Sequence, residues 1–68
     1  MKIVVGEKIK ELRLCNSMTQ DNLAEKLFVS QSTIAKWEAG RLEPSYKILM
    51  MIKEMFNVSM DYIFGYED

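Results

Sequence analysis

Hydrogen-bonding side chains occupy one face of the segment between residues 31 and 39. At 100° per residue, Ile34 and Trp37 lie together on one side of a helix in this segment. The opposite side carries small or polar residues, namely Ser32, Ala35, Lys36 and Ala39, with Gln31 at the exposed N-terminal edge. This face holds no acid and suits the major groove of DNA, because bulky side chains would block the base edges and phosphates would repel a carboxylate.

The residue types needed for covalent or metal chemistry are scarce in this chain. Cys15 is the only cysteine, so it cannot form an internal disulfide. There is no His, so Cys15 has no base to activate it and no partner for a zinc site. Gly6, Gly40 and Gly65 are too scattered to form a phosphate-binding loop. We therefore expect no enzyme, no metal and no cofactor, and we interpret Cys15 as a partly buried, small apolar residue.

The candidate recognition segment is the second half of a longer pattern over residues 19–40. Thr19 and Ser30 are the predicted N-caps of two short helices separated by a tight turn. The inner face of the first helix would carry Leu23, Ala24 and Leu27. Two such helices joined by a tight turn are the sequence form of a helix-turn-helix.

Helical periodicity extends over nearly the whole chain, which predicts one all-α domain over residues 1–68. Hydrophobic staples flank three Ser or Thr caps, in the pairs Met18 and Leu23, Val29 and Ile34, and Val58 and Ile63. The expected helices cover about 5–15, 19–27, 30–39, 45–56 and 59–64, followed by a short acidic tail over 65–68.

The helix expected over 45–56 has more apolar residues than one core-facing stripe needs. We expect the stripe to consist of Ile48, Leu49, Ile52, Met55 and Phe56. Methionines usually pack in cores, yet Met50 and Met51 lie beside this stripe. We therefore hypothesise a homodimer surface that includes Met51, Met60, Tyr62 and Tyr66 together with the acidic tail.

Length and charge limit the kind of protein that this chain can form. A chain of 68 residues buries about 60% of its unfolded surface, which predicts modest stability and leaves no room for a small-molecule effector domain. Residues 1–53 hold all nine Lys and Arg with six acids, whereas residues 54–68 hold four acids, so the acidic end should point away from DNA. We find no transmembrane stretch and no signal peptide, and we expect a soluble, cytoplasmic protein without membrane contact.

Four longer motifs cover most of residues 5–65: ELR at 11–13, MTQDNLAEKL at 18–27, VSQSTIAKWEAGRLEPS at 29–45 and FNVSMDYIFG at 56–65. Together they resemble the Xre-type helix-turn-helix regulators, which include phage Cro proteins and the N-terminal domains of phage repressors. The resemblance implies a compact five-helix bundle like the lambda repressor DNA-binding domain, with the helix-turn-helix at helices 2 and 3. It also implies that a dimer binds double-stranded operator DNA with the third helix in the major groove.

The resemblance further implies roles for individual residues. Gln20 would contact a phosphate and brace the first base-reading residue, unless it is a solvated residue of the first helical turn. Base contacts are implied for Gln31, Ser32 and Lys36, with a solvated polar face as the alternative. Phosphate contacts are implied for Thr33, Arg41 and Ser45, of which Ser45 could instead act only as an N-cap.

Arg13 and Glu38 are expected to form a structural ion pair. The helical wheel places Glu38 beside Ile34 at the edge of the core-facing side, and the resemblance places Arg13 across from it. We interpret both residues as part of the scaffold that links the first helix to the third.

Two residues depart from the family pattern in the helix-turn-helix. Phe28 stands where the turn usually has Gly, so it must either accept a left-handed backbone or rearrange the turn. An exposed Phe28 would also be a possible protein contact. Asn22 replaces the usual Glu at the third helical position, which predicts an incomplete capping box.

These observations predict a sequence-specific DNA-binding transcriptional regulator, specifically a repressor that binds a two-half-site operator as a dimer. The alternative from another class is a protein-interaction module, such as an antitoxin or anti-repressor partner. The acidic late segment and Phe28 are its best support.

Overall fold

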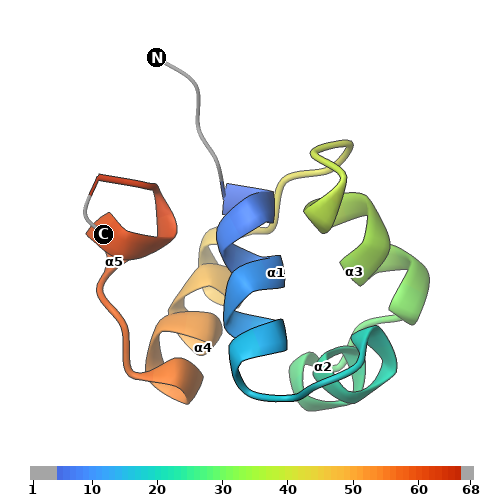
Figure 1. Cartoon of the computed structure of the whole chain (residues 1–68). Coiled ribbons are helices and arrows are strands. Elements are labelled where there is room, and N and C mark those ends of the chain that lie inside the picture. Colours follow the sequence, from blue (N-terminus) through green and yellow to red (C-terminus); the bar gives the residue numbers. More distant parts are fainter. Residues whose placement is uncertain (1–4, 67–68) are drawn as a thin grey trace.

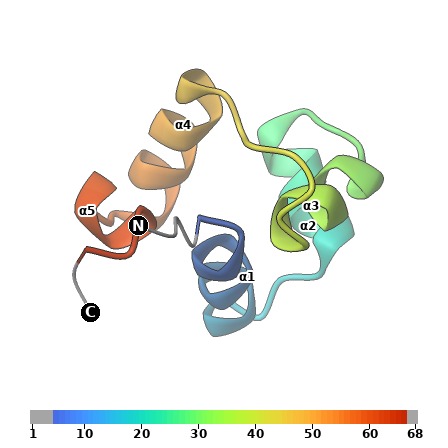
Figure 2. The same ribbon diagram turned by 90° about the horizontal axis from the view of Figure 1, so that it is seen from above.

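The computed structural model describes residues 5–66, which form five helices in a bundle. They are α1 (Val5–Cys15), α2 (Gln20–Leu27), α3 (Gln31–Glu38), α4 (Tyr46–Phe56) and α5 (Met60–Ile63). Figure 1 shows α1 between the α2–α3 pair and α4 with α5, and in the view from above (Figure 2) α4 lies opposite α1, beside α5. α1 packs against α3 and α5, and α2 packs against α4. The predicted all-α, five-helix fold is confirmed.

Helices α2 to α5 each begin after a Ser or Thr whose side-chain oxygen accepts a hydrogen bond from a backbone N–H of the first turn. These N-caps are Thr19, Ser30, Ser45 and Ser59. In α2, Asn22 Oδ1 also accepts a hydrogen bond from the Thr19 N–H at 3.0 Å, while the Asn22 N–H donates to Thr19 Oγ1 at 3.0 Å. The predicted incomplete capping box is wrong, because the amide oxygen of Asn22 reaches the cap nitrogen as a carboxylate would.

The turn between α2 and α3 has the left-handed residue that its geometry usually requires. Phe28 has φ 60° and ψ 41°, and the following N–H of Val29 donates to the carbonyl of Ala24 at 3.0 Å. A bulky residue pays roughly 1–2 kcal/mol in strain for this backbone conformation. Phe28 therefore accepts the strain rather than rearranging the turn, and its side chain is 88% exposed.

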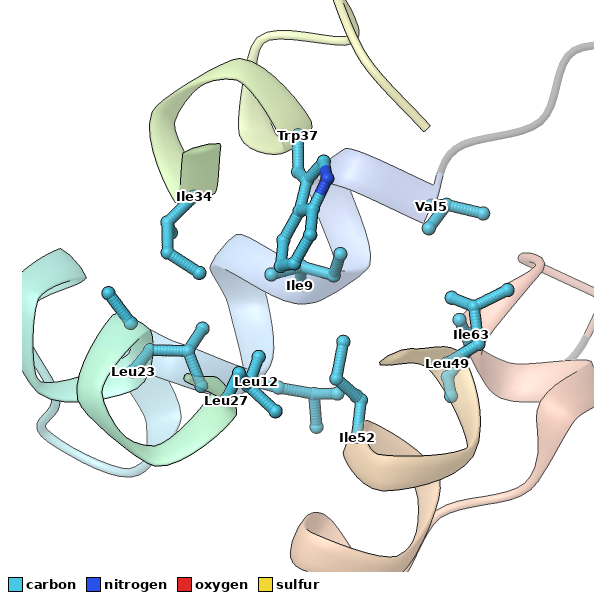
Figure 3. Packing of buried hydrophobic residues seen from close by; sticks show 11 residues of the cluster. Val5, Ile9, Leu12, Leu23, Leu27, Ile34, Trp37, Leu49, Ile52 and Ile63 are labelled. Carbon is cyan, nitrogen blue, oxygen red and sulfur yellow. The ribbon is translucent and has the colours of Figure 1, made fainter. Parts of the chain in front are cut away.

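One apolar cluster joins all five helices (Figure 3). Its buried members are Val5, Ile9 and Leu12 of α1, Leu23, Ala24 and Leu27 of α2, Ile34 and Trp37 of α3, Leu49 and Ile52 of α4, and Ile63 of α5. The first residue of each predicted staple, Met18, Val29 or Val58, packs against this cluster. Met55 does not face the core as predicted, because it lies at the edge of the α4 stripe and is exposed.

The start of α1 approaches the end of α3 closely at Gly6. A Cβ atom on Gly6 would lie 2.1 Å from the carbonyl oxygen of Trp37, far inside van der Waals contact. Any side chain at this position would therefore push the two helices apart. Gly6 thus helps to set how the third helix sits on the first.

Tyr62 attaches the short helix α5 to α1. Its hydroxyl donates a hydrogen bond to Glu11 Oε1 at 2.7 Å, and Nζ of Lys8 lies 4.7 Å from the centroid of its ring. The hydrogen bond to Glu11, burial and the negative charge of Glu11 all favour the neutral phenol, and they raise the pKa of Tyr62 to about 12.

The hypothetical dimer surface is partly engaged within the chain itself. Met51, Met60 and Tyr62 are half-buried and pack against the apolar cluster, whereas Tyr66 is exposed. Glu67 and Asp68 of the acidic tail lie outside the described residues. The prediction of a partly buried Cys15 is wrong: Cys15 is exposed, because it lies beside the buried stripe of α1 rather than on it.

Among residues 5–66, no helix has both the length and the apolar character needed to cross a membrane.

Candidate nucleic-acid interface

Helix α3 buries one side and exposes the side predicted to read DNA. Ile34 and Trp37 point into the apolar cluster (Figure 3). Three of the predicted contact residues on this helix, Gln31, Ser32 and Lys36, are exposed, and Thr33 is half-buried. The one acid of α3 is Glu38, and its side chain is only 6% exposed. The exposed side of α3 therefore carries amide, hydroxyl and ammonium groups without a carboxylate.

Arg13 of α1 holds the Glu38 carboxylate through both of its oxygens. Arg13 Nε lies 2.7 Å from Glu38 Oε2, and Arg13 Nη2 lies 3.1 Å from Glu38 Oε1. Arg13 Nη1 also donates to the carbonyl of Met18 at 3.0 Å. The hydrogen bond to Glu38 raises the pKa of Arg13 even though burial opposes this shift. The ion pair expected from the sequence is present, and it ties α1 to the C-terminal end of α3.

A chain of hydrogen bonds continues from this ion pair to the exposed side of α3. Gln20 Nε2 donates to Glu38 Oε1 at 3.1 Å, and Gln31 Nε2 donates to Gln20 Oε1. The first residues of α2 and α3 are thus connected to the buried carboxylate. Gln20 braces Gln31 as the resemblance implied, and it does so while it is itself held by Glu38.

The N-terminal end of α3 offers further polar groups. Ser30 Oγ accepts a hydrogen bond from the N–H of Thr33 at 3.2 Å, and the two hydroxyl oxygens lie 2.9 Å apart. The first turn of a helix has N–H groups without intrahelical partners and a partial positive charge. Thr33 therefore lies where an anionic group such as a phosphate would be stabilised.

Arg41 and Ser45 lie in the loop that connects α3 to α4. Gly40 adopts a φ of 75°, and the N–H of Arg41 then donates to the carbonyl of Lys36 at 2.9 Å. The side chain of Arg41 is exposed. Ser45 Oγ accepts a hydrogen bond from the Ile48 N–H at 3.3 Å, so its predicted capping role is present.

The sequence reasoning did not single out Tyr46, which is the first residue of α4. It is 71% exposed, and it directly follows Ser45 at the end of the loop that holds Arg41. An aromatic residue directly after an N-cap, outside the apolar stripe of its helix, was the signal that could have identified it. The bond between Gln20 and Glu38 was also missed, and no local pattern indicates it.

Comparisons with known proteins agree with this arrangement. A family model described as helix-turn-helix matches residues 9–63. An uncharacterized HTH-type transcriptional regulator of Methanocaldococcus jannaschii is 43% identical over 61 residues, which are 90% of this chain and 92% of that protein. The HTH-type transcriptional activator BcrR of Enterococcus faecalis is 39% identical over 63 residues. The match covers 93% of this chain but only 31% of BcrR, so this chain spans about a third of that relative.

Among solved structures, the P22 c2 repressor in complex with a synthetic operator has a TM-score of 0.84 at 26% identity. The alignment covers 97% of this chain and 100% of the repressor chain. The family match runs from within α1 to the end of α5, and both relatives are named as HTH-type transcriptional regulators or activators. This chain belongs to the Xre-type helix-turn-helix family of DNA-binding transcriptional regulators.

Proposed function

We propose that residues 1–68 act as one sequence-specific DNA-binding domain of a repressor, which occupies two operator half-sites as a homodimer. The half-site centres would lie about one DNA turn apart, with one α3 in the major groove at each. Of the three base-contacting residues, Gln31 would pair with adenine N6 and N7, and Lys36 with guanine O6 and N7. Ser32 can contact either donor or acceptor edges.

The exposed side of α3 is the observation that carries this proposal. It presents hydrogen-bonding groups without a carboxylate, because the side chain of Glu38 is withdrawn into an ion pair with Arg13. An exposed acid at this position would repel the phosphates on both sides of the groove. The buried pair therefore supports entry of α3 into a major groove.

Phosphate contacts would come from residues on both sides of the reading face. They are Gln20 at the start of α2, Thr33 in the first turn of α3, and Arg41 and Ser45 in the loop before α4. Contacts of this kind fix the orientation of the protein on the duplex without reading sequence. Bases and phosphates would thus be contacted by different residues of one surface.

Selection from random double-stranded DNA, followed by affinity measurements, tests the proposal directly. Lys36→Ala should reduce discrimination at particular base pairs, because it removes a base contact. Arg41→Ala should instead weaken binding to all sequences and reduce the slope of log affinity against log salt by about one unit. Lys26→Ala, which removes an exposed cation from the last turn of α2, is the matched control for net charge.

The contrary outcomes of this experiment are informative. A protein without DNA affinity at low salt would favour the protein-interaction module, for which the exposed Phe28 is a candidate contact. A reporter gene that is switched on rather than off by the protein would replace repression with activation, the function named for BcrR.

A further inference from the structure

The hydrogen-bonding character of Glu38 determines how the Gln20 amide is oriented. A carboxylate only accepts hydrogen bonds, so the Gln20 group that faces Glu38 Oε1 at 3.1 Å must be its NH2. The carbonyl oxygen of Gln20 then points to the other side. There it accepts a hydrogen bond from the NH2 of Gln31.

This order of donors and acceptors decides what Gln31 can offer to a base. One N–H of Gln31 is used by Gln20, which leaves the second N–H and the carbonyl oxygen. In the major groove adenine presents an acceptor and a donor, whereas guanine presents two acceptors. The remaining N–H and carbonyl oxygen of Gln31 therefore complement adenine.

Reversal of both amides would change this preference. The carbonyl oxygen of Gln31 would then face the NH2 of Gln20, and both N–H groups of Gln31 would be available to DNA. Two donors complement the two acceptors of guanine. The orientation of the amides thus distinguishes between two base pairs, although the residue that contacts the base is the same.

We propose that Glu38 is a specificity-positioning residue, which makes Gln31 select adenine over guanine by fixing the amide of Gln20. This role of Glu38 rests on the proposed base contact of Gln31, and it explains how the scaffold would set the base preference of that contact. Arg13 contacts both carboxylate oxygens, and the Glu38 side chain is 6% exposed, so the carboxylate is held in place as an acceptor.

Selection from random double-stranded DNA tests this role with the full chain and its variants. Gln31→Ala identifies the base pair that Gln31 contacts. Glu38→Gln gives residue 38 a donor as well as an acceptor, so the Gln20 amide can adopt either orientation. The preference for adenine over guanine at that base pair should then fall about tenfold, within the range expected for a bidentate contact. The preference at the base pair read by Lys36 should stay unchanged, which a general loss of structure would not allow.

Two further variants make the test independent of charge and folding. Glu25→Gln removes the same charge from an exposed site on α2, and it should raise affinity for all sequences without changing the preference. Gln20→Met removes the bridging amide from a half-buried position outside the apolar cluster. Gln20→Met should also relax the adenine preference. If circular dichroism shows that Glu38→Gln is unfolded, Gln20→Met alone tests the positioning role.

An unchanged adenine preference in folded Glu38→Gln, or in Gln20→Met, would overturn the positioning role while leaving the proposed function intact. A wild-type preference for a base other than adenine at the Gln31 position would overturn it as well. If Gln31→Ala alters selectivity at no base pair, the proposed base contact itself fails, and the positioning role fails with it.

Discussion

Arg13 and Glu38 form a buried ion pair, because their side chains are 10% and 6% exposed. Arg13→Ala would leave the Glu38 carboxylate buried without its partner. We expect the free energy of unfolding to fall by about 3 kcal/mol, measured by chemical denaturation near pH 7. An unchanged thermal midpoint in this variant would contradict a structural role for the pair.

Replacement of both partners separates the cost of an unpaired charge from the contribution of the pair. Arg13→Met combined with Glu38→Leu removes both charges and fills similar volume, so its stability should lie much closer to that of the wild type. Lys10→Ala, at an exposed position on the same helix, controls for loss of a surface cation and should change stability by less than about 0.5 kcal/mol.

At the scale of structural elements, the turn between α2 and α3 contains strain that a single substitution should relieve. Phe28→Gly removes the penalty of a left-handed bulky residue but adds backbone entropy to the unfolded state. The net gain in the free energy of unfolding should be about 0.5–1 kcal/mol, visible as a rise of several degrees in the thermal midpoint. Little packing is lost, because Phe28 is 88% exposed.

Phe28→Ala is the matched control for this turn, since it removes the aromatic ring without relieving the left-handed strain. Its stability should remain at or below that of the wild type. Equal stabilisation by Ala and Gly would show that loss of the ring, rather than the backbone conformation, is responsible.

The attachment of α5 to α1 should depend on pH through Tyr62. Its pKa in the folded protein is raised to about 12, whereas an unperturbed Tyr titrates near 10. The folded state binds the phenolic proton more tightly, so this stabilisation is complete below about pH 10 and is lost as pH rises to about 12. The free energy of unfolding that wild type has in excess of Tyr62→Phe should therefore fall as pH rises from about 10 to about 12.

Tyr66→Phe provides the control for the pH experiment, because it removes an exposed hydroxyl near the same helix. Denaturation curves between about pH 9 and pH 12 would compare all three proteins. Parallel pH dependence in wild type and Tyr62→Phe would exclude a contribution from the bond to Glu11.

At the scale of the whole molecule, binding to two half-sites requires a second copy of the chain. We expect light scattering after size-exclusion chromatography at micromolar concentration to give a protein mass of twice the 8.0 kDa protomer. This should hold for the free protein or for the protein part of its complex with DNA. Tyr66→Asp places a charge on the proposed dimer surface and should weaken association at least about tenfold. Leu14→Asp is the control, because Leu14 is similarly exposed, at 57% against 59%, but lies on α1.

A monomeric mass both with and without DNA would remove the dimer from the proposal. An effect of Leu14→Asp equal to that of Tyr66→Asp would instead show that association does not depend on the proposed surface.

The sequence by itself determined the helices and the side of α3 that is exposed. The N-caps and staples are interactions between residues at most five positions apart. Thr19, Ser30 and Ser45 therefore indicate the starts of their helices from local sequence. The exposure of Lys36 and the burial of Trp37 follow from helical periodicity alone. The resemblance to a known family supplied the expected pairing of Arg13 with Glu38, which periodicity could not provide.

Only the tertiary structure decided how these parts work together. The packing of α1, α2 and α3 brings Gln20 within 3.1 Å of Glu38, although 18 positions separate them in the chain. The packing of α1 against α3 leaves no space for a side chain on Gly6, and the packing of α5 against α1 gives Tyr62 a partner in Glu11. Distances between helices depend on the crossing of their axes, and a helical wheel describes one helix at a time. The orientation of the Gln20 and Gln31 amides, which we propose selects adenine, therefore becomes apparent only in the assembled fold.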